Sequence, residues 1–122
     1  EALQFIGWLA TAKHKHKTLI IDTLDWLEPK LFQAVCKRDG KSSIEDYGYG
    51  KGYTVACDEF RRMIAGLEML HNKGMMIIIN AHCQIKSFSN PIGDNYDRYE
   101  MKVSKQIAGL VKEWADAVLF AR

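Results

Sequence analysis

The sequence predicts an α/β fold in which helices cover both faces of a mostly parallel sheet, a three-layer α/β/α arrangement. The first observation is a set of short, continuously apolar runs over residues 18–22, 75–80 and 117–121. Strands that are buried on both faces of a parallel sheet typically show such runs. The second observation is that segments with helical periodicity separate these runs. Alternating strands and helices are typical of crossover units in a parallel sheet.

Length and composition limit the class of protein. The chain has 122 residues, enough for one domain or part of one. Its 17 Lys and Arg residues against 15 Asp and Glu residues give a formal net charge of +2, too balanced for a chain devoted to coating nucleic acid. With 48% hydrophobic and 26% charged residues, the composition is that of a globular domain and excludes a fibrous class. No apolar run approaches the roughly 18 residues that a membrane-spanning helix needs.

The cysteines indicate a reducing environment. Cys36, Cys57 and Cys83 are odd in number and show no CxxC spacing. This pattern predicts reduced thiols and therefore a cytoplasmic protein. A zinc site formed by Cys57, His82 and Cys83 is disfavoured, because the paired-ligand spacing of zinc motifs is absent.

The first half of the chain reads as helix, strand, helix and loop. Residues 2–12 have helical periodicity, and residues 18–22 form the first predicted strand. Pro29 suits the first position of a helix, since its missing N–H would have no partner there. Gly40 is a plausible stop for that helix. Residues 39–53 are rich in glycine and tyrosine, and we predict a loop long enough to suggest a function.

The second half repeats the alternation. Residues 54–72 place apolar side chains at the spacing of a core-facing helix, and the strand at 75–80 follows. We predict a polar loop over residues 86–99. Ser104 can cap a helix over residues 105–115, after which the third apolar run comes.

Polar side chains follow the first two predicted strands at the point where each ends. Asp22 comes directly after the first strand. Asn80 ends the second strand, and His82 and Gln84 follow it. Ligands of open parallel sheets bind beyond the carboxyl ends of the strands. The sequence therefore predicts a site for metal and phosphate at this edge.

Two interpretations of these residues are open. An acid after an apolar strand has the form of a Walker B element, in which a carboxylate orients the water ligands of Mg²⁺. An imidazole or amide just beyond the next strand suits a group that contacts a terminal phosphate or the attacking water. Alternatively, Asp22 caps a turn, and His82 and Gln84 only cap the strand end.

Four blocks of the sequence, taken in order, resemble the RecA-like ATP-binding proteins encoded by bacteriophages, which are P-loop NTPases. The blocks are TLIIDTLDWLEPKLFQAVCKRDGKSSIEDYGYGKGY, MIIINAHCQIK, YDRYEMKVSK and EWADAVLFAR. The resemblance implies ATP and Mg²⁺ as cofactors. It implies that Asp22 holds Mg²⁺ through water with Thr23 beside it at the nucleotide, and that His82 or Gln84 senses the γ-phosphate.

One element of the family is absent from the sequence. No GxxxxGK(S/T) motif occurs, and the glycine-rich residues 48–53 have the wrong spacing and follow the Walker B position. A P-loop needs backbone N–H groups around the β-phosphate and a Lys that reaches it. We therefore expect residues 1–122 to be a single RecA-like domain fragment, from the helix before Walker B to the strand after the second DNA-facing loop. Such a fragment should bind nucleotide poorly by itself.

The resemblance also implies partners. Residues 37–53 and 86–102 are similar in placement to the two DNA-facing loops of RecA-like cores. Lys51, Tyr53, Lys86 and Arg98 combine cations with aromatic rings, as surfaces that bind single-stranded DNA do. RecA-like proteins assemble into rings or filaments, so we expect a homo-oligomer of the intact protein and no membrane partner.

Two other functions remain as alternatives. The chain could be a non-catalytic module of the same fold that binds single-stranded DNA or supports assembly. It could also be a metal-dependent nuclease that uses Asp22, Asp25 and Glu28 as a carboxylate cluster, although no lysine stands beside them as in the usual nuclease pattern.

Overall fold

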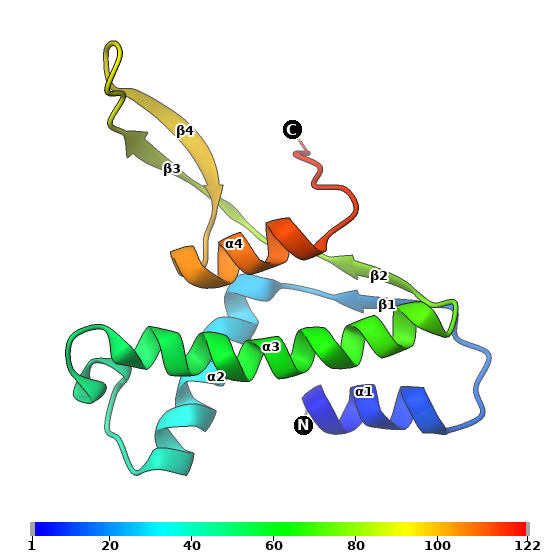
Figure 1. The fold of residues 1–122 in the computed structure, drawn as a ribbon. Coiled ribbons are helices and arrows are strands. Elements are labelled where there is room, and N and C mark those ends of the chain that lie inside the picture. Colours follow the sequence, from blue (N-terminus) through cyan, green and yellow to red (C-terminus); the bar gives the residue numbers. More distant parts are fainter. Residues whose placement is uncertain (1, 122) are drawn as a thin grey trace.

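The computed structural model describes residues 2–121 and shows a mixed α/β fold (Figure 1). No helix among these residues is both long enough and apolar enough to cross a bilayer. The elements in chain order are α1 (Ala2–Thr11), β1 (Thr18–Ile21), α2 (Leu24–Asp39), the short 3₁₀ helix η1 (Ile44–Tyr47), α3 (Lys51–Asn72), β2 (Met76–Ile79), β3 (Cys83–Phe88), β4 (Tyr96–Met101) and α4 (Lys105–Trp114).

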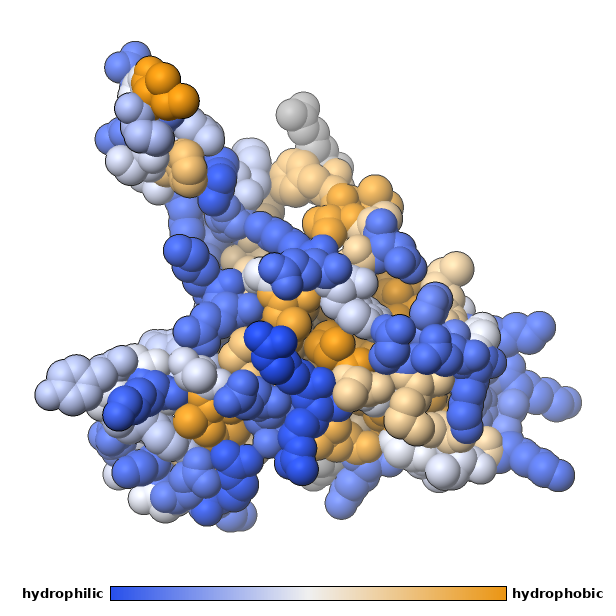
Figure 2. Space-filling model, in the orientation of Figure 1, coloured by the Kyte–Doolittle hydropathy of each residue, from blue (hydrophilic) through white to orange (hydrophobic). Residues whose placement is uncertain are grey.

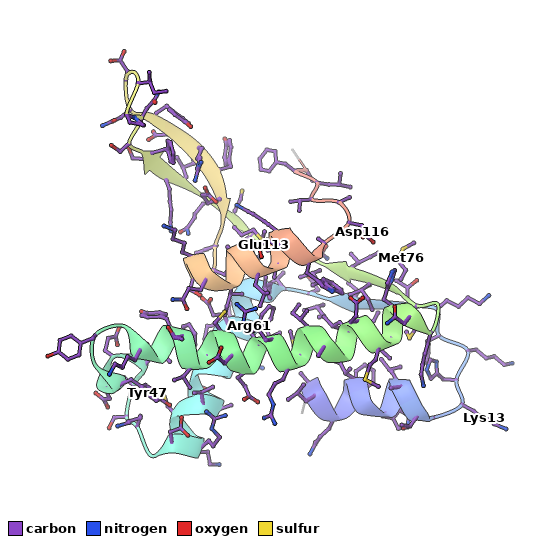
Figure 3. The ribbon with its side chains drawn as sticks, viewed as in Figure 1. Lys13, Tyr47, Arg61, Met76, Glu113 and Asp116 are labelled. Atoms are coloured by element: carbon purple, nitrogen blue, oxygen red, sulfur yellow. The ribbon has the colours of Figure 1, made fainter. Side chains whose placement is uncertain are left out.

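The predicted parallel pairing is confirmed for the first two strands. β1 pairs with β2 in parallel, from Thr18 opposite Met76 to Ile21 opposite Ile79. Alternate residues of these strands, such as Ile21 and Ile79, pack against the helical core. The opposite face is exposed, with Ile20 at 57% and Met76 at 61% of their full accessibility (Figure 3). Within the described residues, helices therefore cover one face of this sheet, and the three-layer arrangement is not confirmed.

The core forms along α3, the longest helix of the chain. Its buried side chains recur at helical spacing and pack against α1, α2 and α4 (Figure 1). Phe60, Leu67 and Leu70 on this helix are almost completely buried. A long helix with a continuous apolar stripe on one side is stabilised mainly by the packing of that stripe against other elements, and less by the intrinsic helix propensity of its residues. The prediction of a core-facing helix here is confirmed.

The helix α2 begins five residues before the predicted start. It runs from Leu24, and Pro29 lies inside it rather than at its first position. Leu24 is 1% exposed, and its backbone N–H donates to the carbonyl of Asn80 at 2.8 Å. This buried anchor fixes the first turn next to the end of β2. Tertiary packing thus outweighs the loss of one internal hydrogen bond that a proline in a helix causes.

The predicted loop over residues 86–99 is instead a β-hairpin. β3 and β4 pair antiparallel, from Cys83 opposite Met101 to Phe88 opposite Tyr96. The hairpin projects from the helical body and is not hydrogen-bonded to the parallel strands (Figure 1). The turn residues Pro91 and Gly93 occupy only its tip, so their presence does not make the whole segment irregular.

The predicted third strand at residues 117–121 is wrong. The described part of this segment has no regular secondary structure, and Leu119 is 90% exposed. Figure 2 shows apolar surface over this part of the chain. A strand needs a neighbouring strand for its backbone hydrogen bonds. None of the described strands pairs with this segment, so its apolar sequence alone does not make it a strand.

The glycine-rich loop is largely ordered by a small second core. Ile44 in η1 packs with Cys36 of α2 and Ala56 of α3, and Tyr47 and Tyr53 lie against this cluster. Gly52 approaches η1 so closely that a Cβ at this position would lie 2.1 Å from the carbonyl oxygen of Ile44. The glycine therefore permits helix–loop contact at the start of α3.

Candidate functional site

The parallel pairing brings the ends of β1 and β2 together. The N–H of Asn80 donates to the carbonyl of Ile21 at 2.9 Å, and the N–H of Leu24 donates to the carbonyl of Asn80 at 2.8 Å. These bonds continue the ladder past both strands. Asp22 and Thr23 therefore follow β1 directly beside Asn80, which follows β2. This is the edge at which the sequence predicted a ligand site.

Asp22 presents a free carboxylate at this edge. The residue is exposed, and its side chain makes no hydrogen bond or ion pair with any residue of the described chain. The neighbouring Thr23 hydroxyl oxygen is buried and has no hydrogen-bond partner among these residues. A buried hydroxyl without a partner costs about 1–3 kcal/mol. The exposed Asp22 carboxylate is therefore available to a ligand or to ordered water.

His82 is held at the same edge by Asp25, a residue of the first turn of α2. One carboxylate oxygen of Asp25 accepts the backbone N–H of His82 at 2.9 Å, and the other lies 2.9 Å from Nδ1 of the ring. The Asp25 side chain is 8% exposed, whereas that of His82 is 63% exposed. The ring is thus anchored on one side and open to solvent on the other.

The charge of Asp25 follows from these contacts. Burial would raise the pKa of its carboxyl group, but the hydrogen bonds from the backbone and the side chain of His82 outweigh burial and lower the pKa to about 2. Asp25 is consequently a carboxylate at neutral pH and can only accept hydrogen bonds. The sequence had suggested Asp25 only as a possible metal ligand. Its contact with His82 joins residues 57 positions apart, so no local pattern could have revealed it.

Gln84 lies in a different environment. It is the second residue of β3, half-buried, and its side-chain amide donates to the carbonyl of Met101 at 3.4 Å. This contact ties the amide to the opposite strand of the hairpin. The two predicted sensor positions are therefore not equivalent, because His82 faces solvent at the strand end and Gln84 supports the hairpin.

The carboxylate cluster predicted for a nuclease does not form. Glu28 accepts the backbone N–H of Ser104 at 2.7 Å and so joins α2 to the start of α4, while Asp25 is bound to His82. Among residues 2–121 no group of three His, Cys, Asp or Glu side chains could hold a metal ion. The same finding gives no support to a zinc site formed by Cys57, His82 and Cys83. Helical spacing had suggested that Asp25 and Glu28 face one way, but each carboxylate has its own backbone partner.

The second predicted DNA-facing segment is the hairpin. Lys86 and Arg98 lie opposite each other on its two strands. The guanidinium of Arg98 lies 4.2 Å from the centre of the Phe88 ring and 2.5 Å from Glu100. Glu100 also pairs with Lys112 at 3.0 Å, and these cations lower the pKa of its carboxyl group. Arg98 is therefore already partly neutralised within the hairpin.

Of the two contacts predicted in the first DNA-facing segment, Lys51 is exposed and Tyr53 is half-buried. Tyr53 packs edge-on against Phe32, with ring centres 5.7 Å apart, and its hydroxyl donates to Glu45 at 3.5 Å. The ring thus contributes to the second core instead of presenting a face to a base. The ring of Tyr49, by contrast, is fully exposed.

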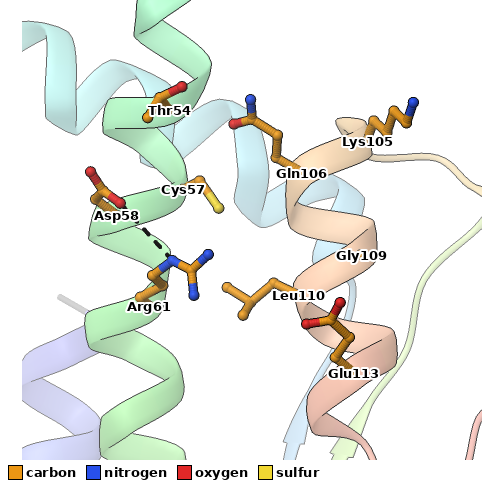
Figure 4. Close-up of a pocket in the computed structure, with 9 residues that line it drawn as sticks. All are labelled: Thr54, Cys57, Asp58, Arg61, Lys105, Gln106, Gly109, Leu110 and Glu113. Carbon is orange, nitrogen blue, oxygen red and sulfur yellow. Dashed lines mark ion pairs between the residues drawn. The ribbon is translucent and has the colours of Figure 1, made fainter.

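A shallow groove of about 400 Å³ lies elsewhere, between α3 and α4 (Figure 4). Its lining residues are Thr54, Cys57, Asp58, Arg61, Lys105, Gln106, Gly109, Leu110 and Glu113. Charges of both signs face it, and Arg61 pairs with Asp58 at 4.0 Å. None of the lining residues belongs to the segments that follow β1 and β2, so the groove is separate from the strand-end site.

Comparison with known proteins identifies the family. A family model described as an AAA domain matches residues 1–122. The chain belongs to this AAA domain family. The match supports a nucleotide-binding, ATPase-like domain of the P-loop type, in agreement with the α/β fold. No curated protein matches the sequence. No solved structure matches it either.

Proposed function

We propose that this AAA domain supplies one part of a Mg²⁺-dependent ATP-hydrolysing site in a RecA-like core. The observation that carries the proposal is that Asp22 and His82 both follow paired strands at the carboxyl edge of a parallel sheet, in a chain of the AAA family. In this scheme Asp22 orients the water ligands of Mg²⁺ and Thr23 lies at the nucleotide. His82 or Gln84 contacts the γ-phosphate or the attacking water.

The residues at the edge fit a hydrated Mg²⁺ ion. Mg²⁺ usually keeps several waters and takes one or two carboxylates from the protein. The Asp22 carboxylate is exposed and unpaired within the described residues, and the Thr23 hydroxyl beside it has no partner there. When bound, Mg²⁺ would neutralise charge on the phosphates. The other acids of this region are engaged with His82 and with the backbone of Ser104.

The phosphate-cradling loop must come from elsewhere under this proposal. The 122 residues contain no GxxxxGK(S/T) sequence. We therefore assign that role to residues outside them and expect the 122 residues to bind ATP weakly when isolated. We further propose that the intact protein is a phage-encoded recombination or replication protein that acts in the bacterial cytoplasm. It would assemble as a homo-oligomeric ring or filament.

The proposal is tested by measuring the rate of ATP hydrolysis by the natural protein that contains these 122 residues. We expect Asp22→Ala to lower kcat by about 100-fold or more, the size of effect seen when one charge-stabilising group is removed. Asp116→Ala is the matched control, because Asp116 is an exposed acid outside the segments that follow β1 and β2. Unchanged turnover in Asp22→Ala, or no hydrolysis by the wild type, would refute the assignment.

A second candidate is a non-catalytic module that binds single-stranded DNA. The projecting hairpin favours it, since the rings of Phe88 and Tyr96 pack at a tilt with centres 5.1 Å apart, and Arg98 lies over the Phe88 ring. Its charges do not favour it, because Asp94, Asp97 and Glu100 outnumber Lys86 and Arg98. Fluorescence anisotropy with a labelled oligonucleotide separates the candidates. Binding that needs no ATP and survives Asp22→Ala would support the module.

A further inference from the structure

We propose that the turn between α1 and β1 forms a binding site for single-stranded nucleic acid, in which stacked rings contact bases and neighbouring lysines neutralise phosphates. Four side chains make up this ring column: Phe5, Trp8, His14 and His16. The turn lies at the amino ends of β1 and β2, where the N–H of Met76 donates to the carbonyl of Lys17 at 2.8 Å (Figure 1). This is the opposite end of the strands from the candidate site, so the proposal does not depend on ATP hydrolysis.

The first observation is that the ring column is continuous and lies on the surface. The ring centres of Phe5 and Trp8 are 6.0 Å apart, with an angle of 14° between the ring planes. The ring of His14 lies 5.8 Å from that of Trp8 and 5.5 Å from that of His16, and both pairs are stacked. Phe5 and Trp8 are 52% and 47% exposed, and His16 is exposed as well. The rings are therefore not part of the buried core.

Hydrogen bonds fix the middle of the ring column. Nε2 of His14 lies 2.8 Å from the carbonyl oxygen of Leu9, and Nδ1 lies 3.2 Å from the backbone nitrogen of His16. A carbonyl oxygen only accepts and a backbone N–H only donates, so in these contacts Nε2 carries the proton and Nδ1 accepts. Both ring nitrogens are thus used within the turn. A surface that is already ordered avoids part of the entropy cost of ordering it on binding.

The second observation is a local excess of positive charge. Lys13, Lys15 and Lys17 are exposed, and none of their side chains makes a hydrogen bond or an ion pair with another described residue. Figure 3 shows Lys13 projecting from the turn. No Asp or Glu occurs among residues 2–21, whereas the whole chain carries a net charge of only +2. Unpaired lysines of this kind neutralise phosphates and release counterions from a nucleic acid.

Rings and cations together select the class of ligand. The bases of a single strand can stack on exposed rings, and this contact tolerates any base. Phe5 and His16 end the ring column, and no other described ring stacks on either, so a base can extend the column at both ends. A helix that binds a lipid surface instead buries a continuous apolar face. Two rings of this column are imidazoles in a non-helical turn, which favours a polynucleotide over a membrane.

The salt dependence of binding by the natural protein tests the lysines. Fluorescence anisotropy of a labelled oligothymidylate, recorded without nucleotide at several salt concentrations, gives the affinity and its slope against salt. Each phosphate contact with a single strand contributes about 0.7 to the slope of log K against log salt, so Lys13→Ala/Lys15→Ala should reduce the slope by about 1.4. Lys30→Ala/Lys105→Ala is the matched control, since both lysines are exposed and lie on α2 and α4. An unchanged slope in Lys13→Ala/Lys15→Ala, or an equal reduction in the control, overturns the proposal.

Variants of the ring column separate stacking from charge. At about pH 8, where an ordinary histidine is neutral, His16→Ala should lower the affinity by about 10-fold, the size expected for one lost stacking ring, and leave the salt slope unchanged. His16→Phe keeps a ring at this position and should restore most of the affinity. His71→Ala is the control, because His71 is an exposed histidine of α3 outside the ring column. Wild-type affinity in His16→Ala, or no recovery in His16→Phe, overturns the stacking contact.

The choice of ligand completes the test. Binding of oligothymidylate, of oligouridylate or of both supports the proposal and identifies the sugar that the site accepts. A duplex of the same length that binds as tightly as the single strand would overturn it, because paired bases cannot stack on the column. Binding to phosphatidylserine vesicles and to no oligonucleotide would overturn it in favour of a lipid surface. Single-strand binding that survives every variant of the turn would also overturn this site and leave the hairpin as the candidate.

Discussion

The close approach of Gly52 to η1 gives a sharp prediction about what orders the glycine-rich loop. A Cβ at position 52 would lie 2.1 Å from the carbonyl oxygen of Ile44 and 2.9 Å from Cγ1 of the same residue. The oxygen belongs to the backbone of η1, so it cannot rotate away as a side chain can. Gly52→Ala therefore requires η1 and the start of α3 to move apart by at least about 1.3 Å, from 2.1 Å to the 3.4 Å at which ordinary contact begins.

The magnitude follows from two opposing effects. Inserting a methyl group into a packed contact costs typically about 1–3 kcal/mol. Replacing glycine by alanine within a helix gains about 0.5–1 kcal/mol. The contact that is forced apart also carries the small core of Ile44, Cys36 and Ala56. Because the clash is with backbone, the cost lies at the upper end of its range, and we expect a net loss of about 2 kcal/mol in the free energy of unfolding.

Gly109→Ala is the matched control. Gly109 lies inside α4, and no atom beyond its chain neighbours and the backbone of its own helix lies within 4 Å of the position that its Cβ would take. The same chemical change should therefore stabilise the protein by about 0.5–1 kcal/mol. Urea unfolding followed by circular dichroism measures both variants, and equal slopes validate comparison of the midpoints. If Gly52→Ala is as stable as the wild type, or if both variants shift in the same direction, the reasoning about this contact is wrong.

Two further predictions concern the acids near the strand ends. Glu28→Ala removes the acceptor of the Ser104 N–H at 2.7 Å and should lower the free energy of unfolding by about 1–3 kcal/mol. Glu113→Ala, at an exposed residue, should change it little. Equal urea midpoints for the two variants would show that Glu28 does not join α2 to α4. The pKa of Asp25 falls from 3.8 to about 2 on folding. Its ionised carboxylate therefore contributes fully to the free energy of unfolding when the pH is above the unfolded pKa, and this contribution is lost as the pH falls from 3.8 towards 2. Urea midpoints measured across this range should fall less steeply in Asp25→Asn than in the wild type, and parallel curves would contradict the folded-state contact with His82.

Local patterns in the sequence determined much of the fold. The spacing of apolar side chains predicted α1, α3 and α4 within a few residues, since one side of each helix must be buried. The β-branched runs predicted β1 and β2, and the alternation of strand and helix predicted their parallel pairing. The position of Asp22 after β1 followed from the same runs.

Only the tertiary structure decided the features that depend on distant partners. The apolar run at 117–121 is not a strand, because no described strand pairs with it. The segment after β2 becomes a hairpin because Cys83–Phe88 and Tyr96–Met101 pair with each other. Leu24 starts α2 because it is buried beside the end of β2.

The candidate site shows the same division. The sequence placed Asp22, His82 and Gln84 at strand ends but left His82 and Gln84 equivalent. Their difference arises from contacts with Asp25 and Met101, which lie 57 and 17 residues away along the chain. Hydrogen bonds of this kind depend on how strands and helices pack, and no local pattern of residue types encodes them. The residue types at the edge are a property of the sequence, whereas the orientation of each side chain is a property of the fold.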